Sequence, residues 1–353
     1  MNNYLTRKIK VLSFLSILAV VWIHAFNSQP RYLQPGSWME EGWNISSFIQ
    51  FFISNGAARF AVPLFFLISG YLLFRTYDGT LQVYLRKLMD RVRTLLVPYL
   101  IWNTLGILVI LGFLLVPWTQ LTVAPWMAEM TWDQYLIGYL ISPAAYQLWY
   151  LRDLFLFILM APLWFFLLNN KWLGRGLLAV SLVLAATNLS LSIFNTTGLF
   201  FFLWGCRVGL TPGRVDRRIS RHAWEILTAL WIFLLILRVA FSAQEAVVSG
   251  LLYFPIEILG VGVFWYGYDH LTRKSQDVRP FKLGETTMII FLGHVPLLPL
   301  WTDFFLSMTK NQVGDQLLLY FLLPAGIILS LIALDRTMNR FFPGLRSLLT
   351  GGR

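Results

Sequence analysis

The segment Arg59-Phe-Ala-Val-Pro-Leu-Phe-Phe-Leu-Ile-Ser-Gly-Tyr71 decides the fold class of this chain. It is apolar enough for a membrane, yet it has an arginine at one end and Ser69-Gly70-Tyr71 at the other. A charged side chain inside a span costs about 2.5–3.5 kcal/mol on insertion scales, so such an arginine marks a candidate functional site. The alternative is that Arg59 only reaches outward to the lipid headgroups.

The composition extends this interpretation to the whole chain. Of the 353 residues, 57% are hydrophobic and 13% are charged, and the mean hydropathy is +0.64. Soluble domains carry about 25% charged residues. Alternating apolar and polar strands are absent, so helices are expected to satisfy the backbone in lipid. We therefore predict an all-α polytopic membrane protein that forms a single domain over residues 1–353. The single cysteine, Cys206, excludes an internal disulfide and a thiolate metal site, and we predict no metal.

About ten apolar runs are long enough to be transmembrane helices. The second is expected to bend at Pro63, because proline removes a backbone hydrogen bond, and the sixth is short. The first follows basic residues as in a signal peptide, but Ala25-Phe26-Asn27 is a poor cleavage site, so we expect an uncleaved span. The predicted spans are residues 11–27, 47–74, 94–116, 148–169, 177–193, 198–210, 223–241, 247–268, 286–306 and 317–335.

Basic residues gather in alternate loops of this arrangement. With the N-terminus inside, most of the 28 Lys and Arg residues fall in inner segments, and residues 94–147 contain none. Cytoplasmic loops carry such an excess, so both termini are predicted to be cytoplasmic. The topology thus explains the net charge of +11. We expect membrane lipids as partners, and no nucleic acid.

Four polar positions inside or at the ends of spans are candidates for chemistry. His24 lies in an apolar helix, where a neutral imidazole can act as a general base or can simply bond a backbone carbonyl. His294 lies mid-span and is a candidate for the same reason. Arg152-Asp153 is either a local ion pair or a pair that fixes an acceptor hydroxyl. Glu257 requires a partner or a proton within its span, and the sequence does not name one.

A basic cluster formed by Arg86, Arg91 and Arg93 directly precedes the third span. Anchoring on the cytoplasmic side is sufficient to explain it. The functional alternative is a phosphate site, because arginine forks match phosphate oxygens. The sequence contains no glycine-rich phosphate loop, serine nucleophile elbow or cluster of metal ligands.

Taken together, these segments resemble acyltransferase family 3, whose members include bacterial O-acetyltransferases of surface polysaccharides. The sequence VPLFFLISGYLLF with the upstream Arg59 resembles the signature of the family. Four further segments fit, and the resemblance covers nearly the whole chain. They are VLSFLSILAVVWIHAF, RVRTLLVPYLIW, QLWYLRDL and TTMIIFLGHVP.

The resemblance implies a donor, an acceptor and a location. The donor would be acyl-CoA, usually acetyl-CoA, arriving from the cytoplasm as a substrate and not as a permanently bound cofactor. The acceptor would be a hydroxyl of a cell-surface or periplasmic glycan, or of a lipid-linked sugar. The enzyme would lie in the bacterial inner membrane. From a different class, a transporter or flippase of a lipid-linked sugar would use the same arginines for binding. Such proteins often show paired repeats with broken helices, and the sequence shows none.

The resemblance also implies roles for individual residues. His24 would be the catalytic base or a transient acyl carrier, and Arg59 the conserved arginine. The family usually has Arg or Lys eleven residues before the histidine, where this chain has Ser13. Either Lys10 replaces it from one turn away, or the donor is held differently, or this member of the family is less active. The substrate-binding residues would be Ser69, Tyr71, Arg152, Asp153 and His294, and the phosphates of coenzyme A would bind Arg86, Arg91 and Arg93.

Overall fold

The computed structural model describes residues 3–27, 45–114, 131–141, 143, 145–187, 193–211, 213, 215, 217–242, 246–272, 281–308 and 313–352. Helices make up the fold of these residues, which confirms the predicted all-α class. The elements are α1 (Asn3–Asn27), α3 (Ile45–Gln50), η1 (Phe51–Gly56), η2 (Ala57–Phe60), α4 (Ala61–Phe74), α5 (Leu81–Arg91), η3 (Val92–Leu96), α6 (Val97–Leu114), α8 (Trp132–Ile141), η4 (Tyr146–Leu148), α9 (Trp149–Leu159), α10 (Ala161–Asn169), α11 (Lys171–Ala186), α12 (Thr196–Gly209), α13 (Arg221–Ser242), α14 (Ala246–Thr272), η5 (Lys282–Thr286), α15 (Thr287–Met308), α16 (Val313–Phe341) and α17 (Pro343–Thr350).

Six helical segments of the described chain are long and apolar enough to cross a membrane. The number is seven if α9 and α10, which meet at 60°, form one bent span. Each of the ten predicted runs overlaps a helix in its described part, although 148–169 is divided between α9 and α10. However, α11 has 16 residues and α12 has 14, fewer than the roughly 17–25 that usually span a bilayer. A multi-pass helical protein is therefore supported, and the count of ten stays a prediction.

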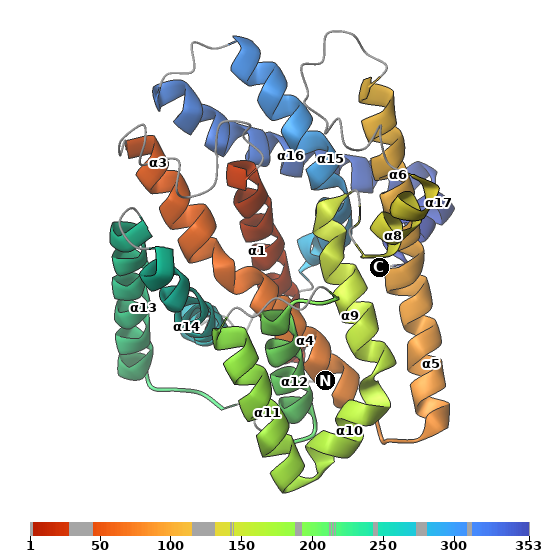
Figure 1. The fold of residues 1–353 in the computed structure, drawn as a ribbon, viewed down its shortest axis with the longest axis vertical. Coiled ribbons are helices and arrows are strands. Elements are labelled where there is room, and N and C mark those ends of the chain that lie inside the picture. The colour runs from red at the N-terminus through yellow and green to blue at the C-terminus, as the bar shows by residue number, and fades with distance from the viewer. Residues whose placement is uncertain are drawn as a thin grey trace.

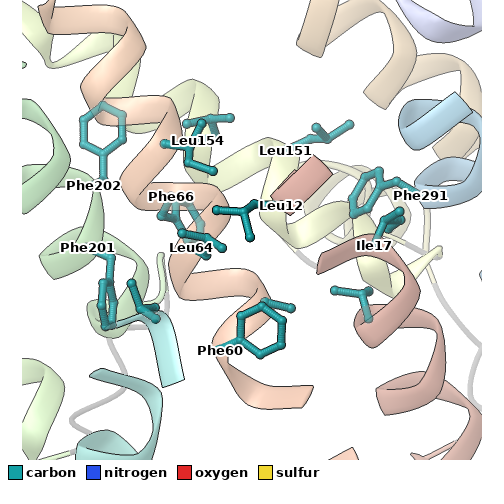
Figure 2. Packing of buried hydrophobic residues seen from close by; sticks show 14 of the residues in the cluster. Leu12, Ile17, Phe60, Leu64, Phe66, Leu151, Leu154, Phe201, Phe202 and Phe291 are labelled. Atoms are coloured by element: carbon teal, nitrogen blue, oxygen red, sulfur yellow. The ribbon is translucent and has the colours of Figure 1, made fainter. Parts of the chain in front are cut away.

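The centre of the bundle is formed by α1, α4 and α12, with α13 and α14 on one side and α5, α6 and α17 on the other (Figure 1). Glycines let α4 and α12 approach closely. A Cβ on Gly70 would lie 2.1 Å from the carbonyl oxygen of Phe202, and one on Gly205 equally close to that of Leu67. Figure 2 shows the apolar packing around α4, with Phe201 and Phe202 on one side and Leu12 and Ile17 on the other.

The helix that contains the signature is irregular before Pro63 and not at Pro63. Here α3, the π-helical η1, the 3₁₀-helical η2 and α4 follow one another directly. Pro63 is the third residue of α4, in a first turn whose N–H groups have no partner within an α-helix, so its missing N–H costs little. The helix type changes at 51–60, directly before Pro63, in the segment that carries Asn55 and Arg59, and the bend at Pro63 stays a prediction.

The end of the bundle that holds the start of α1 is fixed by buried polar contacts. Lys8 forms an ion pair of 2.7 Å with Asp269 of α14, and Tyr4 donates a hydrogen bond of 2.6 Å to the same carboxylate. The ammonium also lies 4.0 Å from the ring centroid of Trp265. Removing one partner of a buried ion pair costs about 3–5 kcal/mol, so these contacts hold α1 against α14.

The C-terminal helix α17 packs back against α6 and α16. Arg346 donates to Asp335 of α16 at 2.8 Å, and the indole of Trp102 in α6 donates to the carbonyl of Leu349 at 3.0 Å. Gly351 ends α17 with φ +69°, and a Cβ there would lie 2.6 Å from Cα of Thr94. The end of the chain is thus held directly against the segment that follows the basic cluster.

Candidate active site

Two buried histidines from distant parts of the chain lie next to each other. His24 lies near the end of α1 and His294 in α15, and their ring centroids are 5.0 Å apart with nearly perpendicular planes. Nδ1 of His24 lies 2.5 Å from the hydroxyl of Tyr146 in η4. The structure therefore brings together the two histidines that the sequence singled out, and it adds Tyr146.

The hydrogen bonds define which nitrogen of His294 can accept a proton. Nδ1 of His294 lies 2.9 Å from the carbonyl oxygen of Ile290. A carbonyl only accepts, so Nδ1 carries the proton of the neutral ring. Nε2 then carries the lone pair, and it is buried without a hydrogen-bond partner among the described residues. A buried unsatisfied acceptor is costly, so this nitrogen is suited to receive a substrate hydroxyl or a proton.

The same reasoning gives Tyr146 an orienting function toward His24. If Nδ1–H of His24 donates to the oxygen of Tyr146, the lone pair of the imidazole is on Nε2. A catalytic histidine that acts as a base through one ring nitrogen is commonly held in a single tautomer by a hydrogen-bond partner on the other ring nitrogen. The contact at 2.5 Å therefore supports a basic Nε2 when the hydroxyl of Tyr146 points its own proton elsewhere.

Arg59 is directed toward protein groups and not toward the headgroups. Its guanidinium donates to the hydroxyl of Tyr253 at 3.2 Å and to the side-chain oxygen of Asn55. The element that carries Arg59, η2, packs against α1, which carries His24, and against α14, which carries Glu257. Glu257, whose partner the sequence did not name, thus lies beside an arginine that is close to the histidine pair.

The pair Arg152-Asp153 forms the local ion pair that was one of its two interpretations. Nε and Nη2 of Arg152 donate to Oδ1 of Asp153 at 2.9 and 2.7 Å, and Nη1 donates to the carbonyl of Ile141. Oδ2 of Asp153 accepts the backbone N–H of Asn195 at 2.8 Å. Asn195 is the N-cap of α12, so the contacts of this pair join α8, α9 and the start of α12.

A cavity of about 510 Å³ lies between α1, α4, α9 and α15. Ser69 lines it with Tyr150, and the two hydroxyls are 3.3 Å apart. Phe291 lines it as well, and the centroid of its ring lies 6.4 Å from that of His294. Tyr71 is buried and is not among the lining residues. Of the predicted substrate-binding residues on α4, Ser69 therefore lines this cavity and Tyr71 does not.

The same cavity explains how Ser13 and Lys10 are placed. Both residues line it from α1, and Ser69 lines it from α4. Lys10 lies 3.8 Å from Glu285 in a partly exposed ion pair. Lys10 therefore supplies a positive charge to the wall on which Ser13 stands.

A second cavity, of about 650 Å³, lies beside the basic cluster and the end of the chain. Lys87, Arg91 and Arg93 line it together with Ser347 and Gly351. Arg91 lines both cavities, so it lies where the two approach each other. Arg86 is exposed and lines neither of the two. The structure therefore places two of the three predicted phosphate ligands at a cavity.

Comparison with known proteins identifies the family of this chain. A family profile described as an acyltransferase domain matches residues 7–335. The chain belongs to acyltransferase family 3. The matched range runs from α1 to α16 and includes both histidines and Arg59, so the resemblance found in the motifs is confirmed. We refer to the protein below as the acyltransferase.

One curated relative is similar over the whole length of the chain. The succinoglycan biosynthesis protein ExoH of Rhizobium meliloti (strain 1021) is 26% identical over 374 residues, covering 100% of the acyltransferase and 94% of the relative. No solved structure matches the chain. The family membership identifies an O-acyltransferase, and the long apolar helices of the described residues agree with a multi-pass membrane protein. Among its described residues, no group of three or more His, Cys, Asp or Glu is placed to hold a metal ion.

Several site residues were not found from the sequence. Tyr146 directly precedes the segment QLWYLRDL, but a tyrosine at the end of a span is also typical of an interfacial belt. Tyr253 lies four residues before Glu257, which the sequence did single out, and so shares one face of α14 with it, which was a usable signal for Tyr253. Nothing in the sequence indicates that Arg238 of α13 reaches Asn55.

Proposed function

We propose that the acyltransferase moves an acyl group, acetyl in the simplest case, from cytoplasmic acyl-CoA to a hydroxyl of a cell-surface or periplasmic glycan. It does so in the bacterial inner membrane, with about ten spans and both termini in the cytoplasm. The observation that carries the proposal is the buried pair His24 and His294 near a cavity that extends to Arg91.

The two cavities support a bipartite donor site. The phosphates of coenzyme A bind Arg91 and Arg93 at the larger cavity, with Lys87 adding a third positive charge. The pantetheine arm extends past Arg91 into the smaller cavity along Ser69 and Tyr150. The thioester then lies next to Phe291, whose ring contacts that of His294. The donor leaves after each reaction, so no cofactor is held permanently.

The residues around His24 support acyl transfer by base catalysis. Nε2 of His24 takes the proton of the acceptor hydroxyl while its oxygen attacks the thioester carbonyl. The tetrahedral intermediate carries a negative charge on oxygen, and the positive charge of Arg59 stabilises it. Collapse breaks the C–S bond, and the leaving thiolate takes the proton from the imidazolium. In the covalent alternative His24 first holds the acyl group itself and the hydroxyl attacks it there.

The direct test of the function is transfer of label from [14C]acetyl-CoA by the purified, detergent-solubilised protein to glycan from the host membrane. We expect labelled glycan that releases acetate in mild alkali, as an ester does. A transporter or flippase would move a lipid-linked sugar across a vesicle without labelling it. Absence of ester formation with every donor and glycan fraction offered would contradict the proposal.

The donor site predicts a specific effect of Arg91→Gln. Loss of a charged hydrogen bond to phosphate is worth about 1.5–3 kcal/mol, so KM for acyl-CoA should rise roughly tenfold or more, with little change in kcat. Arg175→Gln is the matched control, because Arg175 is exposed on α11 and stacks on Trp172. Steady-state kinetics with varied acyl-CoA measures both. An equal rise in KM in the two variants would show a general charge effect and contradict the site.

A further inference from the structure

Two arginines from different helices meet inside the bundle. Arg238 of α13 has 8% of its surface exposed and donates to the backbone carbonyl of Asn55. Arg59 of η2 donates to the side chain of the same asparagine. Tyr253 lies between them, with its ring centroid 4.6 Å from the guanidinium carbon of Arg238 and 5.5 Å from that of Arg59. This group of residues is called the arginine pair site below.

Among the residues that the structure describes, the charge of the arginine pair site is not balanced. Glu257 is the carboxylate that interacts with both arginines, but among the described residues it forms no ion pair with either. Glu257 accepts a hydrogen bond from Tyr253, but in the described part of the chain its Oε2 is buried without a hydrogen-bond partner, as are Nε of Arg59 and Nε of Arg238. Arginine keeps its proton inside proteins, so at least one positive charge remains in excess. Burying such a charge costs several kcal/mol unless an anion accompanies it.

The position of the site connects it with the reaction. Arg59 interacts electrostatically with His24, and Ser54, next to Asn55, donates to the carbonyl of Trp22 in α1 at 2.7 Å. The irregular helix 51–60 is therefore held against the helix that carries the histidine. The phosphates of coenzyme A are assigned to Arg91, which lines the smaller cavity, whereas none of the residues of the arginine pair site lines it, so these phosphates do not account for an anion here.

We propose that Arg59 and Arg238, with Asn55 and Tyr253, bind an oxyanion group carried by one of the two substrates, in addition to the reacting thioester and hydroxyl. The inference rests on the proposed function and narrows its substrate. Arginine forks are suited to the paired oxygens of a carboxylate or phosphate. The oxyanion is either the terminal carboxylate of a dicarboxylic acyl group or the phosphate of a lipid-linked acceptor.

Kinetics of purified Arg238→Gln with paired substrates distinguishes the two sources. In the first arm, kcat/KM for succinyl-CoA is divided by that for acetyl-CoA with one acceptor. In the second, kcat/KM for an oligosaccharide linked to lipid pyrophosphate is divided by that for the released oligosaccharide with one donor. We expect one of the two ratios to fall by about tenfold or more. Arg238→Lys, which keeps the charge but not the fork, should restore that ratio in part.

Arg221→Gln is the matched control, because Arg221 is on the same helix with its side chain 80% exposed, and it should leave both ratios as in the unmodified protein. A merely structural arginine would lower the activity with all substrates together. Two unchanged ratios in folded Arg238→Gln would therefore overturn the inference while leaving the proposed function intact.

If the unmodified protein transfers no acyl group, the proposed function has failed, and the arginine pair site is then tested by a second measurement, ligand binding. Succinate and inorganic phosphate are then titrated into the detergent-solubilised protein, and its melting temperature is followed, because a ligand of the native state raises it. Stabilisation by either anion that is lost in Arg238→Gln and kept in Arg221→Gln supports the site. Equal behaviour of the three proteins overturns it.

Discussion

His24→Gln should reduce acyl transfer by roughly 10²–10⁴-fold, the usual contribution of a positioned general base, while the protein stays folded. Glutamine is close to histidine in size and can keep a hydrogen bond to Tyr146, which lies 2.5 Å from Nδ1. It cannot accept a proton at neutral pH. The measurement is the initial rate of [14C]acetyl transfer with saturating acyl-CoA, normalised to the amount of protein that is monodisperse in detergent.

Three further variants locate the role of the base. His222→Gln is the control, because the side chain of His222 is 85% exposed, and the rate should not change. Tyr146→Phe should lower kcat by less than His24→Gln, since it removes the orienting partner but not the base. A rate of His24→Gln close to that of the unmodified protein would exclude catalysis by His24. If His294→Gln alone abolished transfer, the base would be Nε2 of His294.

Gly70→Val should prevent correct assembly of the helix bundle. A Cβ at Gly70 lies 2.1 Å from the carbonyl oxygen of Phe202 and 2.9 Å from the backbone nitrogen of Cys206. Backbone atoms of a packed helix cannot turn aside as a side chain can, so α4 and α12 must separate. Overpacking costs about 1–3 kcal/mol even where side chains can adjust, and we expect a larger loss here. The yield of monodisperse protein and its melting temperature in detergent measure it.

The control for Gly70→Val is Gly176→Val, because a Cβ at Gly176 of α11 has no atom within 4 Å. Both variants place the same β-branched residue in a helix, so their difference reports the contact between α4 and α12. Equal yields and equal melting temperatures would mean that the two helices are not packed as described. A loss confined to Gly70→Val would confirm the close approach.

Hydropathy was sufficient to predict the helices but not how they are arranged. Each predicted run overlaps a helix, because long apolar stretches must satisfy their backbone internally in lipid. The short run 198–210 is a helix that is mostly buried at the centre of the bundle, a position that hydropathy cannot distinguish from a lipid-facing one. The helix α17 was not predicted, since its eight residues are held by tertiary contacts such as Arg346 with Asp335.

The site was predicted where single residues were unusual for their surroundings. A histidine or arginine in an apolar run stands out, so His24, His294 and Arg59 were identified. Tyr146 and Asn55 are ordinary residues in ordinary positions, and only the fold brings them to those side chains. Likewise, the basic cluster could be recognised from the sequence. That Arg91 and Arg93 line a cavity and Arg86 does not could not be, because residues of α17 form part of its wall.

The π-helical turn Phe51–Gly56 sets the number of residues between α3 and the part of the helix that begins at Ala57. The function of the site depends on this number. A π turn contains about one residue more than an α turn, and each residue of an α-helix advances the direction of its side chain by about 100°. Deleting one residue from this turn would therefore rotate Asn55 and Ser54 away from Arg59 and from α1, although every side chain involved would still be present. Insertions and deletions in this stretch should thus be as harmful as replacement of Arg59 itself, and relatives that keep the arginine must also keep the length of this turn.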